Sequence, residues 1–517
     1  MSAAAQLPTA NSKMERPALP RFTLGHLWAL TVLVGIFAFV NTHPLRPHDF
    51  WWHLKIGQQI VATGAIPTVD TFSLTQAGAP YTYWVFWLME SAFYLLYRQG
   101  GPALIILAQS LLITLAYGLV LWNAQQRAQS WRIAALVTLG AVALGIPDWN
   151  VRPQVIAFPL AALLLAAIQT YRRRPRWWLL LCFPLCIWVW ANSHGTFPIG
   201  FVVMFLWLAD ESWQLLHTHL VKATERPAPP WGPLVALLAS AGACLLTPQG
   251  YGIFGYVVQM GGDPRIQHLV PEWAPPTFAT PGGTLFLLAV LGSAAVLALS
   301  PRRPNLYQLG TFLGFAFLGL HTSRGSIWFG LVMAPILAEH LAQISEKASE
   351  RKSEKASERV GRQTLQNWLN ALLAGLLLVG AVLSLPWFKA SLPLPPLKAG
   401  VISAETPVAA TRFLLREKPP GPLFHELAYG SYLIWAAAPE YRVFVDTRIE
   451  LYPLEIWKDY LAISQANGDW EAELAGYGVQ TLMLSRVKQP ALIEAARQST
   501  EWGIIYEDEQ TVIFTGK

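Results

Sequence analysis

The residues best suited to chemistry in this sequence lie close together at positions 48 to 53, which read His-Asp-Phe-Trp-Trp-His. A carboxylate such as Asp49 can remove the proton from a hydroxyl group as a general base. If a helix runs from Asp49 to about Thr63, Asp49 and His53 share one face, one turn apart. We therefore interpret Asp49 and His53 as catalytic candidates. The alternative is that Asp49 only caps the helix, while the two tryptophans anchor it at the membrane–water boundary, where indole rings are enriched.

The composition places these residues in a membrane protein. Only 13% of the residues are charged, 53% are hydrophobic, and several apolar stretches are long enough to span a bilayer. The net charge of +6 does not indicate nucleic-acid binding, because the basic residues lie in short loops between apolar spans. Loops of this kind are typical of the cytoplasmic side. The three cysteines lie within apolar spans, which argues against a metal site or a disulfide framework.

The basic loops also give the direction of the chain. Residues 1–23 carry basic side chains before the first span, which predicts that this N-terminal tail is cytoplasmic. We expect the protein to lie in the plasma membrane. The long loop 42–101 then lies outside. Its apolar run at 84–97 is shorter than the roughly 20 residues that a spanning helix needs. We therefore predict two interfacial helices in this loop, the first containing Asp49.

Continuing the alternation predicts a polytopic α-helical protein with about eleven transmembrane helices within residues 24–387. A charged segment at 345–366, which contains a near-exact octad repeat, is then cytoplasmic. A Pro-rich linker at 388–399 leads to residues 400–517, which have the composition of a soluble domain. Alternating strand-like and helix-like runs predict a small extracytoplasmic α/β domain. The expected strands are 442–445, 479–484, 502–506 and 511–514, and the expected helices are 407–416, 454–465 and 490–497.

Unusual polar residues collect at the outer ends of the predicted spans. Singly, each could be a loop residue in water, but together they suggest the lining of a cavity that faces outward. A polyprenyl phosphate keeps its tail in the bilayer and its phosphate at the surface, where arginine can bind it through paired, charge-assisted hydrogen bonds. The substrate-binding candidates are His48, Trp52, Arg152, Asn192, His194, Glu272 and Arg324, with Arg152 and Arg324 as the phosphate binders.

The long outer loop with an acid just after the first span resembles the GT-C superfamily of integral-membrane glycosyltransferases. The resemblance is to enzymes of the dolichyl- or polyprenyl-phosphate mannosyl- and aminoarabinose-transferase type, and more narrowly to a bacterial subgroup of GT-C-like membrane proteins. The stretches that carry it are Asp49-Phe-Trp-Trp-His53 with Gly64-Ala-Ile-Pro67 and Asp70-Thr-Phe-Ser73, Arg152-Pro-Gln154, Asn192-Ser-His-Gly195, and Tyr429-Gly-Ser-Tyr-Leu433 with Val443-Phe-Val-Asp-Thr-Arg448.

This resemblance implies a sugar transferase that uses a lipid-phosphate donor and a glycan, lipid or protein acceptor at the outer face. In this family the acidic residue of the first loop is the usual catalytic residue, which corresponds to Asp49 here. Many members carry a second acid beside the first, whereas this chain has Phe50 there. Asp70 or Glu90 could supply the second carboxylate from the same loop. Some members use a divalent metal, but one clear acid with two neighbouring histidines does not lead us to predict one.

Two other classes of function stay open at this point. A transporter or flippase of lipid-linked sugars would carry ionisable residues at mid-membrane or an inverted repeat, and neither is evident. A non-catalytic envelope scaffold would display the C-terminal domain, and the missing second acid keeps this alternative alive. Asp446 and Arg448 in that domain could bind an acceptor or form a structural pair.

Overall fold

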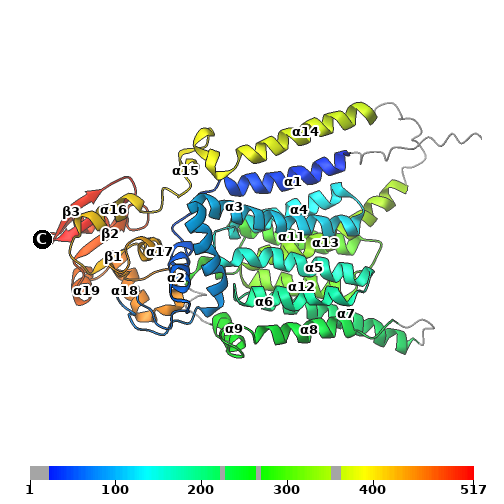
Figure 1. Ribbon diagram of the computed structural model, residues 1–517, viewed down its shortest axis with the longest axis horizontal. Coiled ribbons are helices and arrows are strands. Elements are labelled where there is room, and N and C mark those ends of the chain that lie inside the picture. Colours follow the sequence, from blue (N-terminus) through cyan, green and yellow to red (C-terminus); the bar gives the residue numbers. More distant parts are fainter. Residues whose placement is uncertain (1–21, 222–226, 263–268, 351–362) are drawn as a thin grey trace, which may run out of the picture.

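The computed structural model describes residues 22–221, 227–262, 269–350 and 363–517. Most of the predicted N-terminal tail and the larger part of the octad repeat lie outside these residues. The described chain forms a helical bundle with a small α/β domain at one end, and helix α2 lies across the bundle between the two (Figure 1).

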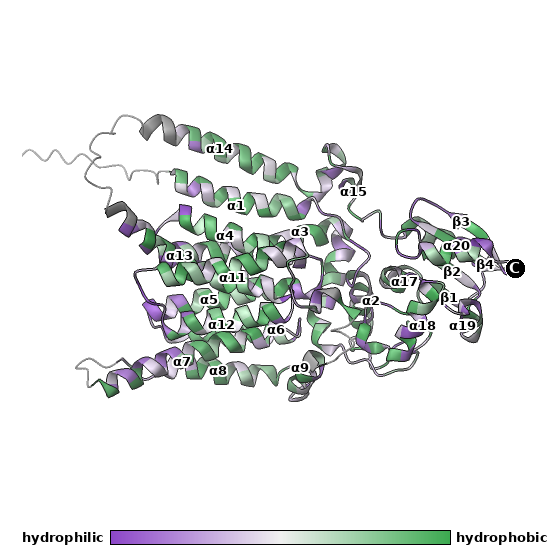
Figure 2. Cartoon of the chain, turned by 180° about the vertical axis from the view of Figure 1, so that it is seen from behind, coloured by the Kyte–Doolittle hydropathy of each residue, from purple (hydrophilic) through white to green (hydrophobic). Residues whose placement is uncertain are grey.

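The bundle is built from long apolar helices. Among the residues that the structure describes, seven helices are long and apolar enough to cross a membrane, and four further apolar helices are shorter. Each of the eleven predicted spans falls on one of them, which confirms the polytopic helical fold. Their hydrophobic residues run along the bundle, and hydrophilic residues gather toward its ends (Figure 2). The helices are α1 (Leu24–Asn41), α3 (Trp87–Ala128), α4 (Trp131–Gly145), α5 (Ala157–Arg173), α6 (Cys182–Ala191), α7 (Pro198–Leu220), α8 (Trp231–Cys244), α11 (Pro281–Leu299), α12 (Leu306–His321), α13 (Gly325–Glu350) and α14 (Gln363–Leu383).

The first loop contains the two interfacial helices that the sequence predicts. Helix α2 (Phe50–Thr63) ends at Gly64 in the left-handed conformation (φ 70°), which glycine adopts without steric cost. The second is the first arm of α3, which bends at Gly101 (φ 59°, ψ −154°) just before Pro102. The remaining short elements are α9 (Gly252–Gly262), α15 (Pro396–Ala399) and the 3-10 turns Trp84–Phe86, Ile146–Asp148, Pro153–Ile156, Trp177–Leu181, Pro271–Trp273, Pro386–Ser391 and Ile449–Leu451.

The C-terminal domain is a four-stranded mixed sheet with helices around it, in the order β1-β2-β4-β3. Strands β1 and β2 are parallel, and β4 runs antiparallel to β2 and β3. The strands are β1 (Leu423–His425), β2 (Thr481–Ser485), β3 (Trp502–Glu507) and β4 (Thr511–Gly516). The helices are α16 (Val408–Glu417), α17 (Leu427–Ala436), α18 (Leu454–Ser464), α19 (Trp470–Gly476) and α20 (Pro490–Gln498).

The strand predicted at 442–445 is wrong. This run makes only an isolated bridge, in which Val443 pairs with Ser73 of the first loop. Val443 is buried in the core shared with the first loop, and Phe444 and Val445 are buried in the core of the C-terminal domain, but none of them pairs within the sheet. The sheet instead contains β1, whose three buried residues are too few to show an alternating pattern.

The first loop and the C-terminal domain form one packed unit. The Leu45 N–H donates to the Val401 carbonyl (2.9 Å), and the Leu74 N–H donates to the Val443 carbonyl (2.7 Å). At the start of α2, the Trp52 N–H donates to Ser431 Oγ (3.2 Å), whose hydroxyl in turn donates to the His48 carbonyl. The domain therefore satisfies backbone groups that the helix itself leaves open.

This packing corrects the anchoring alternative for the two tryptophans. Trp51 is fully buried and packs edge-on against Tyr432, and Trp52 is 4% exposed within the core shared with the C-terminal domain. Asp49 makes no capping hydrogen bond through its side chain. The tryptophans thus join α2 to its protein neighbours instead of anchoring it in lipid.

The contact between α2 and α3 leads to a first prediction. A Cβ on Gly57 would lie 1.9 Å from the Glu90 carbonyl oxygen, a backbone atom that cannot move aside cheaply. We expect Gly57→Ala to force the two interfacial helices apart and to destabilise the protein by about 1–3 kcal/mol or more. Thermal unfolding of the purified protein in detergent, followed by tryptophan fluorescence, measures the effect.

The matched control is Gly35→Ala in α1, because no atom lies within 4 Å of its added Cβ. If Gly57→Ala unfolded at the same temperature as Gly35→Ala, the close helix contact would be wrong.

Candidate active site

Four loops at the C-terminal-domain end of the bundle bring charged side chains together. Glu272 Oε2 lies 2.9 Å from Arg152 Nη1 and 2.6 Å from Arg324 Nη2, so one carboxylate bridges two arginines. Arg152 Nε also lies 2.9 Å from Asp49 Oδ2. Its N–H is not aligned for a hydrogen bond there, so this contact is an ion pair only. Asp49, Arg152, Glu272 and Arg324 therefore form one continuous cluster from residues far apart in sequence.

Three members of this cluster are positioned by the start of a helix or helical turn, and Glu272 lies in the 3-10 turn Pro271–Trp273. Asp49 immediately precedes α2, Arg152 precedes the turn that starts α5, and Arg324 precedes α13. The Arg324 N–H donates to the Glu272 carbonyl (3.2 Å), which fixes the loop that carries Glu272 against α13. The helices thus determine the distances between the charged side chains, and the loops that connect the helices carry these side chains.

The electrostatics of the cluster favour the ionised forms of Glu272 and Arg152. Burial alone would raise the pKa of Glu272, but Arg152 and Arg324 outweigh it and lower this pKa to about 2. Burial would likewise lower the pKa of Arg152, but Asp49 and Glu272 raise it. Arg152 therefore remains cationic beside its two carboxylate partners. Within the described residues, Asp49 Oδ1 accepts no hydrogen bond, so this oxygen is available to a ligand.

A second group of polar residues lies deeper, on α2 and the first arm of α3. His53 Nδ1 lies 2.8 Å from Glu90 Oε1, and the Tyr81 hydroxyl donates to the same oxygen at 3.4 Å. Burial and then His194 lower the pKa of His53 well below its usual value, so its imidazole is neutral at neutral pH. His53 stacks on Trp52 with ring centroids 3.5 Å apart.

The turn after α6 contributes Asn192 and His194. Asn192 Oδ1 accepts from Trp87 Nε1 (2.8 Å), and the Asn192 carbonyl accepts from the Leu88 N–H (3.1 Å). These bonds tie the turn to the start of α3. Burial, followed by Arg324 and Arg152, lowers the pKa of His194 to about 3, so this side chain is also neutral.

Asp70 has a different environment. Its Oδ1 lies 2.6 Å from Arg448 Nη1, its Oδ2 accepts from the Ser73 N–H (2.9 Å), and it is 2% exposed. Asp446 binds the same guanidinium through both carboxylate oxygens, at 2.9 and 2.6 Å. Burial would lower the pKa of Arg448, but Asp446 and then Asp70 raise it. The structure places Asp70 in a buried ion pair that joins the first loop to the C-terminal domain.

Sequence reasoning noted the Asp446–Arg448 spacing but missed its link to Asp70. It also missed Ser431, because a serine that caps a helix from another domain has no signature in its own neighbourhood. Tyr81 was missed for the same reason, since only folding brings it to Glu90. The signals available were the two motifs of the C-terminal domain, one containing Ser431 and the other containing Asp446 and Arg448.

A cavity of about 230 Å³ lies beside the cluster, where α1, α3 and α4 meet at the C-terminal-domain end of the bundle. His48 and Phe50, the neighbours of Asp49, form part of its wall, together with Arg46 and His43. Its other walls are largely apolar, including Phe39 and Trp149 of the facing helices. The cavity thus offers an apolar space with basic residues next to the candidate base.

The residues present do not fit a metal site. Across the described ranges, no three His, Cys, Asp or Glu side chains gather in a way that could hold a metal ion. Asp49 and Glu272, the two carboxylates of the charged cluster, are paired with arginines, whose positive charge would oppose the binding of a cation. We derive no step through a metal.

The fold is shared with two solved membrane glycosyltransferases. The oligosaccharyltransferase AglB from Archaeoglobus fulgidus, in complex with an inhibitory peptide and a dolichol-phosphate, has 12% sequence identity and a TM-score of 0.51; the match covers 95% of this chain and 74% of AglB. ArnT from Cupriavidus metallidurans, bound to undecaprenyl phosphate, has 13% identity and a TM-score of 0.50, with 95% and 97% covered.

A scan against protein-family models and a search of curated proteins found no match. At these identities the structural likeness establishes the fold. The chain has the GT-C fold of integral-membrane glycosyltransferases, as its sequence motifs predict.

The geometry separates the roles of two acids. We expect Asp70→Asn to destabilise the protein by about 3–5 kcal/mol, because it removes one partner of a buried guanidinium. We expect Asp49→Asn to leave the unfolding temperature nearly unchanged, because Asp49 is partly exposed and Arg152 retains its ion pair with Glu272 in the variant. Thermal unfolding and limited proteolysis of the purified variants measure both. Equal stability of the two variants would contradict the structural role of Asp70.

Proposed function

We propose that this protein is a membrane glycosyltransferase that transfers a sugar from a polyprenyl-phosphate donor to an envelope acceptor. The observation that carries the proposal is the cluster of Asp49, Arg152, Glu272 and Arg324, which joins two phosphate-binding groups to a free carboxylate oxygen. The fold supports it, because the two similar structures contain a dolichol-phosphate and an undecaprenyl phosphate. We place this face outside the plasma membrane, with a cytoplasmic N-terminus.

The donor phosphate binds at Arg152 and Arg324 in this proposal. Their guanidinium groups can each form paired hydrogen bonds with phosphate oxygens. Glu272 now occupies them, but it lies on a loop and is 37% exposed. A phosphate at the same place can therefore displace it or share the two arginines with it. The lipid tail would extend from the cavity beside His48 toward the bilayer.

The reaction then needs one base and one leaving group. Asp49 Oδ1 takes the proton from an acceptor hydroxyl while the hydroxyl oxygen forms a bond to the anomeric carbon of the sugar. The bond between that carbon and the phosphate oxygen breaks, and its electron pair leaves with the polyprenyl phosphate. Arg152 and Arg324 stabilise the charge that develops on this leaving group. The protein supplies position and charge, and the activated donor supplies the driving force.

The neutral groups beside the cluster suit the sugar itself. His194 can form hydrogen bonds with hydroxyl groups without adding charge. Asn192, predicted as a substrate-binding residue, is fully buried and bonded to Trp87 and Trp188, so it positions the turn that carries His194. His53 and Glu90 hold α2 against α3 and so position Asp49, and Trp52 packs over His53. We assign Asp70 to the same positioning role through Arg448. Whether the sugar is a hexose or a pentose depends on the shape of this pocket with its ligand bound.

The proposal is tested in a deletion strain by mass spectrometry of envelope glycans and of polyprenyl-phosphate sugars. We expect one glycan to be lost and its lipid-linked donor to accumulate, and we expect wild-type protein to restore both. Asp49→Asn should restore less than about 1% of the product, as expected when a general base is lost. Arg324→Gln should also reduce the product, because it loses phosphate contacts.

The matched control is Glu440→Gln. Glu440 is an exposed residue of the C-terminal domain whose ion-pair partner is Lys418 rather than a member of the cluster. It should behave as wild type at equal expression. Full restoration by Asp49→Asn would remove this residue as the base. An unchanged glycan profile in the deletion strain, together with lipid-sugar transport by purified protein in liposomes, would favour a transporter instead.

A further inference from the structure

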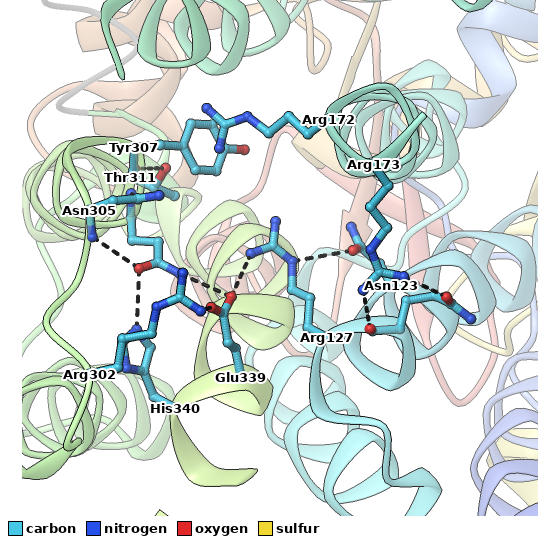
Figure 3. A network of polar contacts seen from close by, with 12 residues as sticks. Asn123, Arg127, Arg172, Arg173, Arg302, Asn305, Tyr307, Thr311, Glu339 and His340 are labelled. Carbon is cyan, nitrogen blue, oxygen red and sulfur yellow. Dashed lines mark hydrogen bonds and ion pairs between the residues drawn. The ribbon is translucent and has the colours of Figure 1, made fainter. Parts of the chain in front are cut away.

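A second arginine-rich site lies at the end of the bundle away from the C-terminal domain. A cavity of about 330 Å³ opens there, where α3 and α5 end and the loop before α12 meets α13. Four arginines line it, namely Arg127, Arg172, Arg173 and Arg302, against the single carboxylate of Glu339 (Figure 3). The lining therefore carries an excess of positive charge. Nothing in the transfer reaction proposed above uses these residues.

Glu339 holds two of the arginines at fixed positions. Its Oε2 lies 3.1 Å from Arg127 Nη1, and its Oε1 lies 2.9 Å from Arg302 Nη1. Gln308 Nε2 donates to the same carboxylate at 3.1 Å. Both oxygens of the one acidic group in the lining are thus occupied, and its charge is shared between two cations.

The other two arginines are held mainly by residues that do not line the cavity. Asp210 and Glu211 lie 2.7 Å from Arg172 Nη2 and 3.6 Å from Arg172 Nε, respectively, and the guanidinium lies over the ring of the lining residue Tyr307 at 4.9 Å. The four arginines still outnumber the three carboxylates that pair with them. Arg173 Nη1 donates to Gln126 Oε1 at 2.7 Å. The side chains are therefore preorganised before any ligand arrives, so little ordering cost remains.

Some guanidinium N–H groups of these arginines have no hydrogen-bond acceptor among the residues that the structure describes. Arg127 Nη2 and Arg172 Nη1 make no hydrogen bond with any residue that the structure describes. Arg127 is only 9% exposed, so water solvates it poorly. A cation with an unused donor in such a place is stabilised by an anion that completes its hydrogen bonds.

We propose that this cavity binds the phosphate group of an anionic ligand. The non-bridging oxygens of a phosphate match the planar forks of two arginines, and the charge of the ligand balances the excess in the lining. Two sources share this chemistry. One is the head group of an anionic phospholipid, which basic pockets between transmembrane helices bind. The other is a soluble phosphate.

The test uses the purified full-length protein after delipidation in a neutral detergent. One arm adds cardiolipin or phosphatidylglycerol, with phosphatidylcholine as the reference. The other adds inorganic phosphate or pyrophosphate, with sodium chloride at matched ionic strength. The readout is the thermal unfolding temperature as a function of concentration, and native mass spectrometry counts the lipids that stay bound.

The variant is Arg173→Gln combined with Arg302→Gln, because both side chains are exposed and Arg127 keeps its bond to Glu339. We expect the wild type to unfold at a higher temperature with the phosphate-bearing ligand. The double variant should need at least about tenfold more of it for each lost guanidinium. Arg303→Gln is the matched control, since Arg303 is the exposed neighbour of Arg302 and does not line the cavity.

Stabilisation by the anionic lipids alone would identify a head-group site, and full stabilisation by phosphate or pyrophosphate would identify a soluble ligand. Either result supports the proposal if the double variant loses it and Arg303→Gln keeps it. No stabilisation beyond the two references, or an equal response of all three proteins, would overturn the proposal. Glycan transfer is not measured, so this outcome is independent of the proposed enzyme activity.

Discussion

The buried guanidinium of Arg448 is the interaction on which the rest of this structure depends. It is 1% exposed and is held by Asp446 from its own domain and by Asp70 from the first loop, 378 positions earlier. Loss of one partner of a buried charge is strongly unfavourable, so this ion pair favours the arrangement in which the two segments are packed together. The backbone pairing of Ser73 with Val443 lies close by in sequence and reinforces the same junction. The first loop and the C-terminal domain are thereby joined through a buried ion pair and a backbone bridge.

This junction reaches the candidate site through α2. The helix starts at the residue after Asp49, its first backbone groups are satisfied by Ser431, and its buried face packs into the core that contains Tyr429 and Val443. On its other side, His53 binds Glu90 of α3. The position of Asp49 is therefore fixed from two directions, by a domain outside the bundle and by a helix that enters it. A general base needs this precision, because small displacements at a reacting centre reduce rates strongly.

The two ends of the bundle use arginine in different ways. At the C-terminal-domain end, Arg152 and Arg324 are matched by Asp49 and Glu272, so the donor phosphate that we propose would compete with carboxylates already present. In the proposed reaction, such competition would allow the anionic product to leave. At the opposite end, Glu339 is the one acidic group in a cavity lined by four arginines. This end of the bundle carries the basic loops from which we predict the cytoplasmic side. Its excess of positive charge suits an anionic ligand that stays bound.

The spans, the two interfacial helices and three of the four strands could be predicted from the sequence. Hydrocarbon thickness and strand periodicity are local constraints, so contiguous residues reflect them. The partners of the charged side chains became clear from the tertiary fold alone. Asp70 and Asp49 look alike in sequence, yet one is buried against Arg448 and the other faces Arg152 with a free oxygen. The run at 442–445 was misread as a strand of the sheet for the same reason, because its pairing partner lies in the first loop. Contacts between distant segments depend on how whole helices pack, and no local pattern of residues encodes them.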